Sequence, residues 1–127
     1  MQDQRIYEYA VIRLVPRVDR EEFINIGVVL YVAGQRFLQL KYALDESRLS
    51  ALFPDIDLND VKCYMHSFDK ICSGDKTAGS LALLPAGQRF RWLTATRSTI
   101  IQTSKVHSGL CTEPILKLEQ LFDSMVK

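Results

Sequence analysis

Residues 23–33, FINIGVVLYVA, form a nearly continuous apolar run that only Asn25 and Gly27 interrupt. A short run of this kind, rich in β-branched residues, is typical of a buried strand. It is far too short to cross a bilayer as a helix. The stretch therefore predicts a strand inside the protein, around which the rest of the fold is arranged.

The segments on either side of this run predict its neighbours in a sheet. Residues 6–15, IYEYAVIRLV, are rich in β-branched and aromatic residues and end at Pro16, which indicates another strand. Residues 36–42, RFLQLKY, alternate between apolar and polar positions after a short turn. We expect 23–33 and 36–42 to form a hairpin, which joins 6–15 in an antiparallel meander.

Two helices are expected next. Asp45 is placed to cap a short helix that ends at Phe53, just before Pro54. Asp57 is placed to cap a longer helix that continues to about Cys72.

The last third of the chain predicts a loop at 73–88, strands at 89–95 and 99–104, and a final helix. Thr112 is expected to cap this helix, with Pro114 in its first turn. Its buried stripe is predicted to consist of Ile115, Leu118, Leu121, Phe122 and Met125.

The element order β-β-β-α-α-β-β-α predicts an α+β fold. We expect a mainly antiparallel sheet of about five strands, with the helices packed on one face. Because no repeat or linker divides the sequence, residues 1–127 are expected to form a single domain.

Composition places the chain among ordinary globular proteins. The net charge is +1, which gives no general attraction to nucleic acid or to an anionic membrane. The cysteine count is three, so one thiol is unpaired in any disulfide scheme, and no signal-peptide pattern is present. These features predict a cytoplasmic protein without a membrane segment.

One segment has a local excess of positive charge. From Lys76 to Thr112 the chain has five Lys or Arg residues and no acidic residue. Polar side chains also gather in this segment, and Asn25 is the one candidate outside it. The candidate ligand-binding residues are Asn25, Arg91, Arg97, Ser98, Gln102, Ser104 and His107, of which His107 is the candidate catalytic residue.

Two interpretations are open for each main candidate. His107 could act as a general acid or base or bind an anion, or it could bond loop backbone and fix a turn. Arg97 could hold a phosphate or carboxylate, or it could pair with Glu22 or Glu8 and fix the sheet.

Asn25 and Trp92 are also open to two interpretations. Asn25 must satisfy its amide inside an apolar strand, either at a bulge beside Gly27 or in a polar pocket with Arg97 or Gln102. Trp92 could be a core residue or could stack on a base.

Several known motifs are incomplete. Gly74 to Gly79 (GDKTAG) lacks the Lys-Ser/Thr that follows the second glycine of a phosphate loop. Cys63 and His66 are three residues apart on a predicted helix, but no second pair completes a zinc site. No G-x-S-x-G elbow supports a Ser-His-acid triad. We therefore predict no cofactor and no metal, and leave open whether the protein is an enzyme.

Two groups of motifs together resemble a known family, the small bacterial proteins of domain-of-unknown-function family 3037. The first is Tyr7 to Arg13 with Pro16 and Glu22 to Val28. The second is Phe90 to Thr94 with Arg97, Ser98, Gln102, Ser104, His107 to Leu110 and Glu113-Pro114. Glu113 stands where such proteins commonly carry Asp. The resemblance implies a cytoplasmic bacterial domain without an established activity. It also suggests a HipA-like kinase as partner, because such proteins are associated with genes for these kinases.

The favoured hypothesis is a non-enzymatic protein-interaction module, which acts with a protein partner or as a homodimer. The alternative is a small enzyme or ligand-binding domain for a phosphate-bearing or nucleic-acid ligand, held in an Arg/Ser/Gln/His pocket. Plain nucleic-acid binding through a basic strand face is a third hypothesis.

Overall fold

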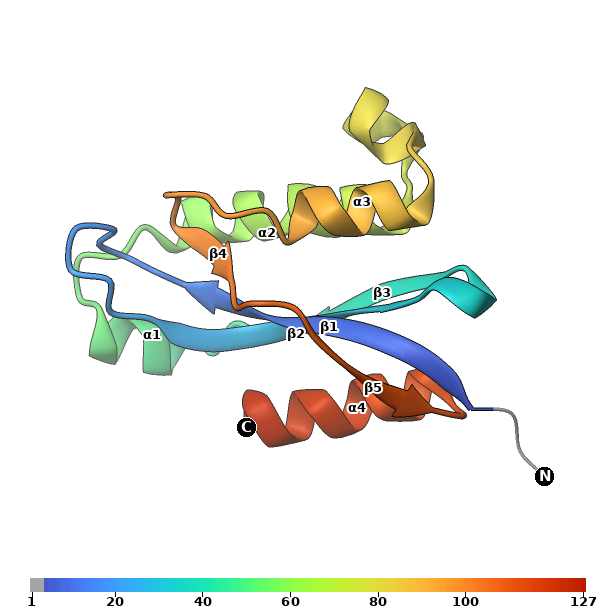
Figure 1. Ribbon diagram of the computed structural model, residues 1–127. Helices are drawn as coiled ribbons and strands as arrows, with labels where there is room; N and C mark the ends of the chain where they lie inside the picture. Colours follow the sequence, from blue (N-terminus) through green and yellow to red (C-terminus); the bar gives the residue numbers. More distant parts are fainter. Residues whose placement is uncertain (1–3) are drawn as a thin grey trace.

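The computed structural model describes residues 4–127 (Figure 1). Its strands are β1 (Arg5–Leu14), β2 (Ile24–Val32), β3 (Phe37–Tyr42), β4 (Ile101–Thr103) and β5 (His107–Cys111). Its α-helices are α1 (Glu46–Leu52), α2 (Leu58–Ser73), α3 (Ala86–Leu93) and α4 (Pro114–Met125). Short 3-10 helices are η1 (Ala33–Gln35), η2 (Lys76–Ala78) and η3 (Ser80–Leu83). None of the helices in this range is long and apolar enough to span a membrane.

All five strands belong to one antiparallel sheet. The order is β3-β2-β1, and the fourth position is shared by β4 and β5, which both pair with β1. β4 pairs with the end of β1 around Arg13, and β5 pairs with its beginning around Tyr7. The predicted α+β class with a five-stranded antiparallel sheet is confirmed.

Helices cover both faces of the sheet, so the expectation of helices on one face is corrected (Figure 1). α2 and α3 pack on one face, here called the α2/α3 face, and α4 packs on the other, the α4 face. The physical reason is that β2 carries apolar side chains on both faces of the sheet. Val29 belongs to the core beneath α2 and α3, whereas Val28 and Leu30 belong to the core beneath α4. A single helical layer would leave one of these rows in water.

The predicted hairpin forms between β2 and β3, with η1 as its connection. A β-bulge interrupts the β1–β2 ladder, because Ile12 pairs with Gly27 and the next residue, Arg13, pairs with Asn25. The bulge beside Gly27 is thereby confirmed. Gly27 lies so close to β3 that a Cβ atom there would be 2.7 Å from both the carbonyl oxygen of Lys41 and the Cβ of Tyr42.

Side-chain caps begin the first two helices where the sequence predicts them. The Asp45 carboxylate accepts a hydrogen bond from the Arg48 amide at 3.1 Å. The Asp57 carboxylate accepts from the amides of Asn59 and Asp60, at 3.0 and 3.2 Å. α2 ends at Gly74, whose φ of 75° is the left-handed conformation that favours glycine.

The prediction of a strand at 89–95 is wrong, because most of this segment belongs to α3. Pro85 precedes the helix, and Ala86, Phe90 and Leu93 follow it at helical spacing. Phe90 and Leu93 are fully buried, and Ala86 packs against the same core. The fifth strand is instead β5, in a segment that was expected to be a loop.

Two details of the last helix also differ from expectation. The N-cap residue is Glu113 rather than Thr112. Ile115, which was placed in the buried stripe, is 61% exposed, whereas its neighbour Pro114 in the same turn is buried. Leu118, Leu121 and Phe122 are buried as predicted.

Candidate functional site

Arg97 fixes the end of α3. Its guanidinium donates hydrogen bonds to the carbonyl oxygens of Trp92 and Ala95 and lies 4.4 Å from the centre of the Trp92 ring. A cation at this position also interacts favourably with the helix dipole. The proposed ion pairs of Arg97 do not form, since Glu8 pairs with Arg91 and Glu22 pairs with Arg20.

Trp92 is half-buried and packs against the core on the α2/α3 face. Arg97 occupies one face of its indole ring. This arrangement supports the core interpretation of Trp92, because the stacked arginine takes the place that a base would need.

Asn25 connects β2 with the end of α4. Its Nδ2 donates to the carbonyl oxygen of Met125 at 3.0 Å, which satisfies one of the open carbonyls at the helix C-terminus. Its Oδ1 is buried without a hydrogen-bond partner. Asn25 pairs with Arg13 across the ladder, and within residues 4–127 it forms no hydrogen bond with Arg97 or Gln102.

The other candidates on the α3–β4 side also make local contacts. Arg91 of α3 donates to Glu8 of β1 at 2.9 Å, and this hydrogen bond raises the pKa of Arg91. Gln102 donates to the carbonyl oxygen of Thr99 at 2.9 Å. Ser98 lies exposed in the loop before β4.

Ser104 joins the two halves of the split edge strand. It lies between β4 and β5 and is 7% exposed. The Val11 amide donates to the Ser104 Oγ at 2.8 Å, the Ser104 amide donates to the Val11 carbonyl at 2.8 Å, and the Ser104 Oγ donates to the Lys105 carbonyl at 2.9 Å. The hydroxyl therefore satisfies a β1 amide at the point where neither β4 nor β5 reaches it.

We expect Ser104→Ala to lower the free energy of unfolding by about 1–3 kcal/mol, because the buried Val11 amide loses its acceptor. Urea unfolding followed by circular dichroism measures this change. The control is Ser108→Ala at an exposed position of β5, which should change stability by less than about 0.5 kcal/mol. Equal effects of the two substitutions would contradict the role given to Ser104.

His107 lies away from the other candidates. It pairs with Tyr9 on β1, and the two rings are 5.4 Å apart. Tyr9 packs against the core beneath α4, so His107 is on the α4 face. Arg97 lies on Trp92 over the α2/α3 face. The structure therefore brings Arg97 together with Trp92 and Ser104 together with Val11, but it does not bring Arg97 and His107 into one pocket.

The cysteines contribute no cluster of metal ligands. Cys63 and His66 are exposed on α2, and within residues 4–127 no three His, Cys, Asp or Glu side chains come together as a metal site would require. Burial raises the pKa of the Cys72 thiol to about 12, so this group stays neutral and packs as a core residue.

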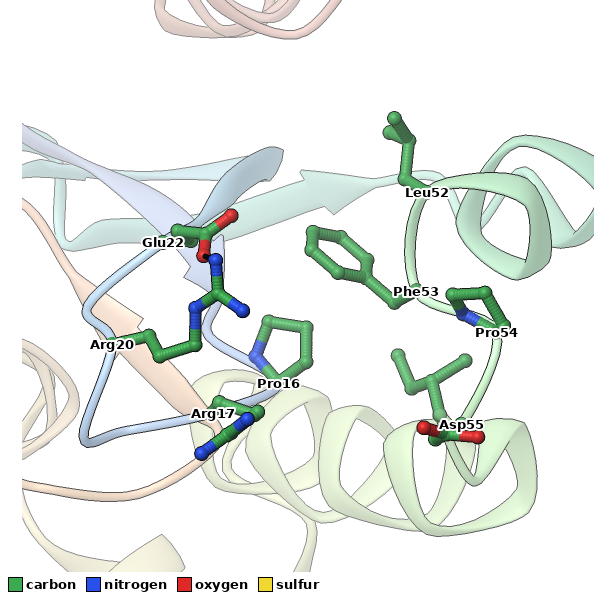
Figure 2. A pocket seen from close by; sticks show the side chains of 9 residues that line it. Pro16, Arg17, Arg20, Glu22, Leu52, Phe53, Pro54 and Asp55 are labelled. Carbon is green, nitrogen blue, oxygen red and sulfur yellow. Dashed lines mark ion pairs between the residues drawn. The ribbon is translucent and has the colours of Figure 1, made fainter.

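A surface pocket of about 360 Å³ lies between the β1–β2 loop and the α1–α2 loop (Figure 2). Its apolar surface is provided by Pro16, Leu52, Phe53, Pro54 and Ile56. Its two arginines are already engaged, since Arg17 pairs with Asp19 and Arg20 pairs with Glu22. The seven candidate residues are not among those that line it.

The surface that stands out is the open edge of β5, which we call the β5 edge. One side of β5 pairs with β1, and within residues 4–127 no strand pairs with its other side. Ile6 of β1 and Leu110 of β5 form a cross-strand pair there and are 68% and 57% exposed. Alternation along β1 places this pair on the α2/α3 face, beyond the Glu8–Arg91 ion pair.

Exposed apolar side chains are frequent in the part of the chain that contains β5 and the start of α4. Eight large hydrophobic side chains are exposed in residues 4–127, four of them between positions 106 and 116, and a fifth is Ile6. The four are Val106, Leu110, Ile115 and Leu116. An open strand edge beside an exposed apolar pair such as Ile6 and Leu110 is a surface suited to pairing with another chain.

The fold is that of an α+β protein with a helix-covered antiparallel sheet, and the β5 edge carries the exposed Ile6–Leu110 pair. The chain belongs to the family described as Protein of unknown function (DUF3037), which matches residues 9–126. A search of curated proteins and a search of solved structures found no match.

Proposed function

We propose that this protein is a non-enzymatic protein-interaction module that binds its partner through the β5 edge. The observation that carries the proposal is the exposed Ile6–Leu110 pair beside a strand edge that no other strand of residues 4–127 pairs with. In β-augmentation, main-chain hydrogen bonds supply affinity and neighbouring side chains supply specificity. The β5 edge offers both elements.

The contacts of the candidate residues support this function over an enzyme. Arg97 is bound to helix carbonyls, Arg91 to Glu8, and Ser104 to Val11. An enzyme that uses Arg97 to hold an anion and His107 to move a proton needs both groups at one ligand. Their positions on opposite faces of the sheet favour the interaction module.

The proposal includes a bacterial, cytoplasmic setting and a HipA-like kinase as one candidate partner. The setting and the kinase come from the family resemblance. The state of the cysteines fits a reducing compartment, since Cys63, Cys72 and Cys111 are all free thiols.

We expect Leu110→Lys to weaken partner binding by at least about tenfold, because a lysine on an edge strand opposes pairing with another chain. The matched control is Leu83→Lys on η3, where the native leucine is also exposed. Both variants should fold like the wild type. Binding is measured by sedimentation velocity for self-association and by titration with a purified HipA-like kinase.

The proposal predicts that Leu110→Lys loses binding in at least one of these two assays, while Leu83→Lys keeps it. Equal binding by both variants would show that the β5 edge is not the interface. Absence of both self-association and kinase binding by the wild type would also contradict the proposal.

A further inference from the structure

We infer that the pocket between the β1–β2 loop and the α1–α2 loop (Figure 2) binds a small organic amine, an apolar molecule that carries one ammonium group. The pocket is separate from the surface of the proposed function, because the residues that line it lie outside β5. Three properties of the pocket indicate this ligand: the defined shape of its walls, its apolar lining and the sign of its unpaired charge.

Backbone hydrogen bonds hold both walls of the pocket. In the β1–β2 loop, the amides of Arg20 and Glu21 donate to the Arg17 carbonyl oxygen at 3.1 and 3.2 Å. Glu21 has a φ of 58°, in the left-handed region that few residues other than glycine occupy. In the α1–α2 loop, the Ile56 amide donates to the Phe53 carbonyl oxygen at 3.0 Å. The walls therefore have a defined shape without a ligand, so binding requires little ordering of the chain.

More than half of the residues that line the pocket are apolar. They are Pro16, Leu52, Phe53, Pro54 and Ile56. Figure 2 shows the Phe53 ring extending from the α1–α2 loop toward Arg20 and Glu22. The pocket volume of about 360 Å³ lies within the range of roughly 300–1,000 Å³ that is typical of small-molecule sites. A compact apolar body such as a phenyl ring can therefore be buried here.

The charge without a partner in this pocket is negative. Each of the two arginines in the lining is paired with a carboxylate of its own loop. Asp55, on the α1–α2 loop, is exposed and takes part in no ion pair within residues 4–127. An ammonium group beside Asp55 supplies the missing positive charge. The Phe53 ring, which also lines the pocket, can attract the same cation through its π face.

The chain around Asp55 strengthens the preference for a cation. Residues 45–60 carry five acidic side chains and one basic side chain: Asp45, Glu46, Asp55, Asp57 and Asp60, against Arg48. This local excess of negative charge attracts cations and repels carboxylates at low ionic strength. A lysine of a partner protein also carries an ammonium group, but its narrow methylene chain covers less of the apolar lining than a ring does. The pocket therefore favours a free amine with a ring-sized apolar body.

Three probes of similar shape test this ligand: phenethylammonium, phenethyl alcohol and hydrocinnamate, which carry a positive charge, no charge and a negative charge. Each is titrated into the full chain near neutral pH and at low ionic strength, and the NMR signals of the Phe53 and Ile56 amides report binding. We expect phenethylammonium to bind about tenfold more tightly than phenethyl alcohol. Hydrocinnamate should bind more weakly than both.

Charge substitutions in the pocket test the role of Asp55. Asp55→Asn should weaken phenethylammonium binding about fivefold and leave phenethyl alcohol binding unchanged, since only an ion pair is lost. Arg20→Gln should strengthen phenethylammonium binding about threefold, because Glu22 loses its cation and adds negative charge to the pocket. The matched control is Asp123→Asn on α4, an exposed carboxylate outside the pocket, which should leave all three affinities unchanged. Because the two pocket variants act in opposite directions, a folding defect cannot produce both results.

Several results would overturn the amine ligand. The site is absent if phenethylammonium at about 10 mM leaves the Phe53 and Ile56 signals unchanged. Equal affinities for the three probes, or wild-type binding of phenethylammonium by Asp55→Asn, would show that the pocket does not select a cation. Tighter binding of Nα-acetyl-lysine amide than of phenethylammonium would assign the pocket to a lysine of a partner protein instead of a free amine. These results leave the β5 edge untouched, so the proposed function stands or falls on its own assays.

Discussion

Phe90→Ala is expected to lower the free energy of unfolding by about 3–5 kcal/mol, a large part of the stability of a protein of this size. Phe90 is fully buried, and its ring stacks on that of Tyr31 with the centres 5.2 Å apart. Since this contact joins α3 to β2, its loss leaves a cavity between helix and sheet. Urea unfolding followed by tryptophan fluorescence measures the change through Trp92, which lies on the same helix.

Phe23→Ala provides the matched control for Phe90→Ala. Phe23 is 48% exposed and contacts the Arg13 guanidinium at 4.2 Å from its ring centre. We expect its removal to cost less than about 1.5 kcal/mol, because little buried area and one cation–π contact are lost. Comparable losses for the two phenylalanines would contradict the assignment of Phe90 to the core.

Gly27→Ala is expected to destabilise the protein by roughly 3 kcal/mol, at the upper end for an added methyl group in a packed region. The new Cβ would come within 2.7 Å of the Lys41 carbonyl oxygen and the Tyr42 Cβ, neither of which can rotate away. Relief therefore requires β2 and β3 to separate at the bulge. Thermal unfolding of the variant measures the loss.

Gly34→Ala is the control for Gly27→Ala. A Cβ at Gly34 would meet only the end of the Arg5 side chain, at 3.2 Å, and this flexible group can move. We expect a change in stability of less than about 1 kcal/mol. If Gly27→Ala is tolerated as well as Gly34→Ala, the close approach of β2 and β3 at Gly27 is not a structural requirement.

The first part of the fold can be predicted from sequence because its signals are local. The β1–β2–β3 meander follows from three apolar or alternating runs, and the starts of α1 and α2 follow from Asp45 and Asp57. The bulge beside Gly27 follows from a polar residue and a glycine inside an apolar strand. Each of these features depends on neighbours within a few residues.

The structure of the segment around α3 is harder to predict from sequence. Residues 89–94, RFRWLT, alternate in polarity as a strand does, and they also fit a helix. The decisive pattern is the spacing of Ala86, Phe90 and Leu93 after Pro85, which places three apolar residues on one helical face. Burial of Phe90 and Leu93 against the sheet then stabilises the helix over the strand. The sequence shows the alternation and the helical spacing together, and packing determines which prevails.

The candidate site could not be placed from sequence because proximity along the chain does not fix the face of a sheet. Arg97 and His107 are ten residues apart, yet β4 and the turn at Ser104 separate them onto different faces. The β5 edge cannot be recognised from sequence for the same reason. Its apolar pair joins Ile6 and Leu110, which become neighbours only through the pairing of β1 with β5.

Amide hydrogen exchange at β5 tests most directly whether the β5 edge is a binding surface. The outward amides of Ser108 and Leu110 should exchange rapidly in dilute protein and at least about tenfold more slowly when a partner, including a second copy at high concentration, occupies the edge. The amides of His107 and Gly109, which face β1, should stay protected in both states. Unchanged exchange of Ser108 and Leu110 under conditions where a complex forms would contradict the account.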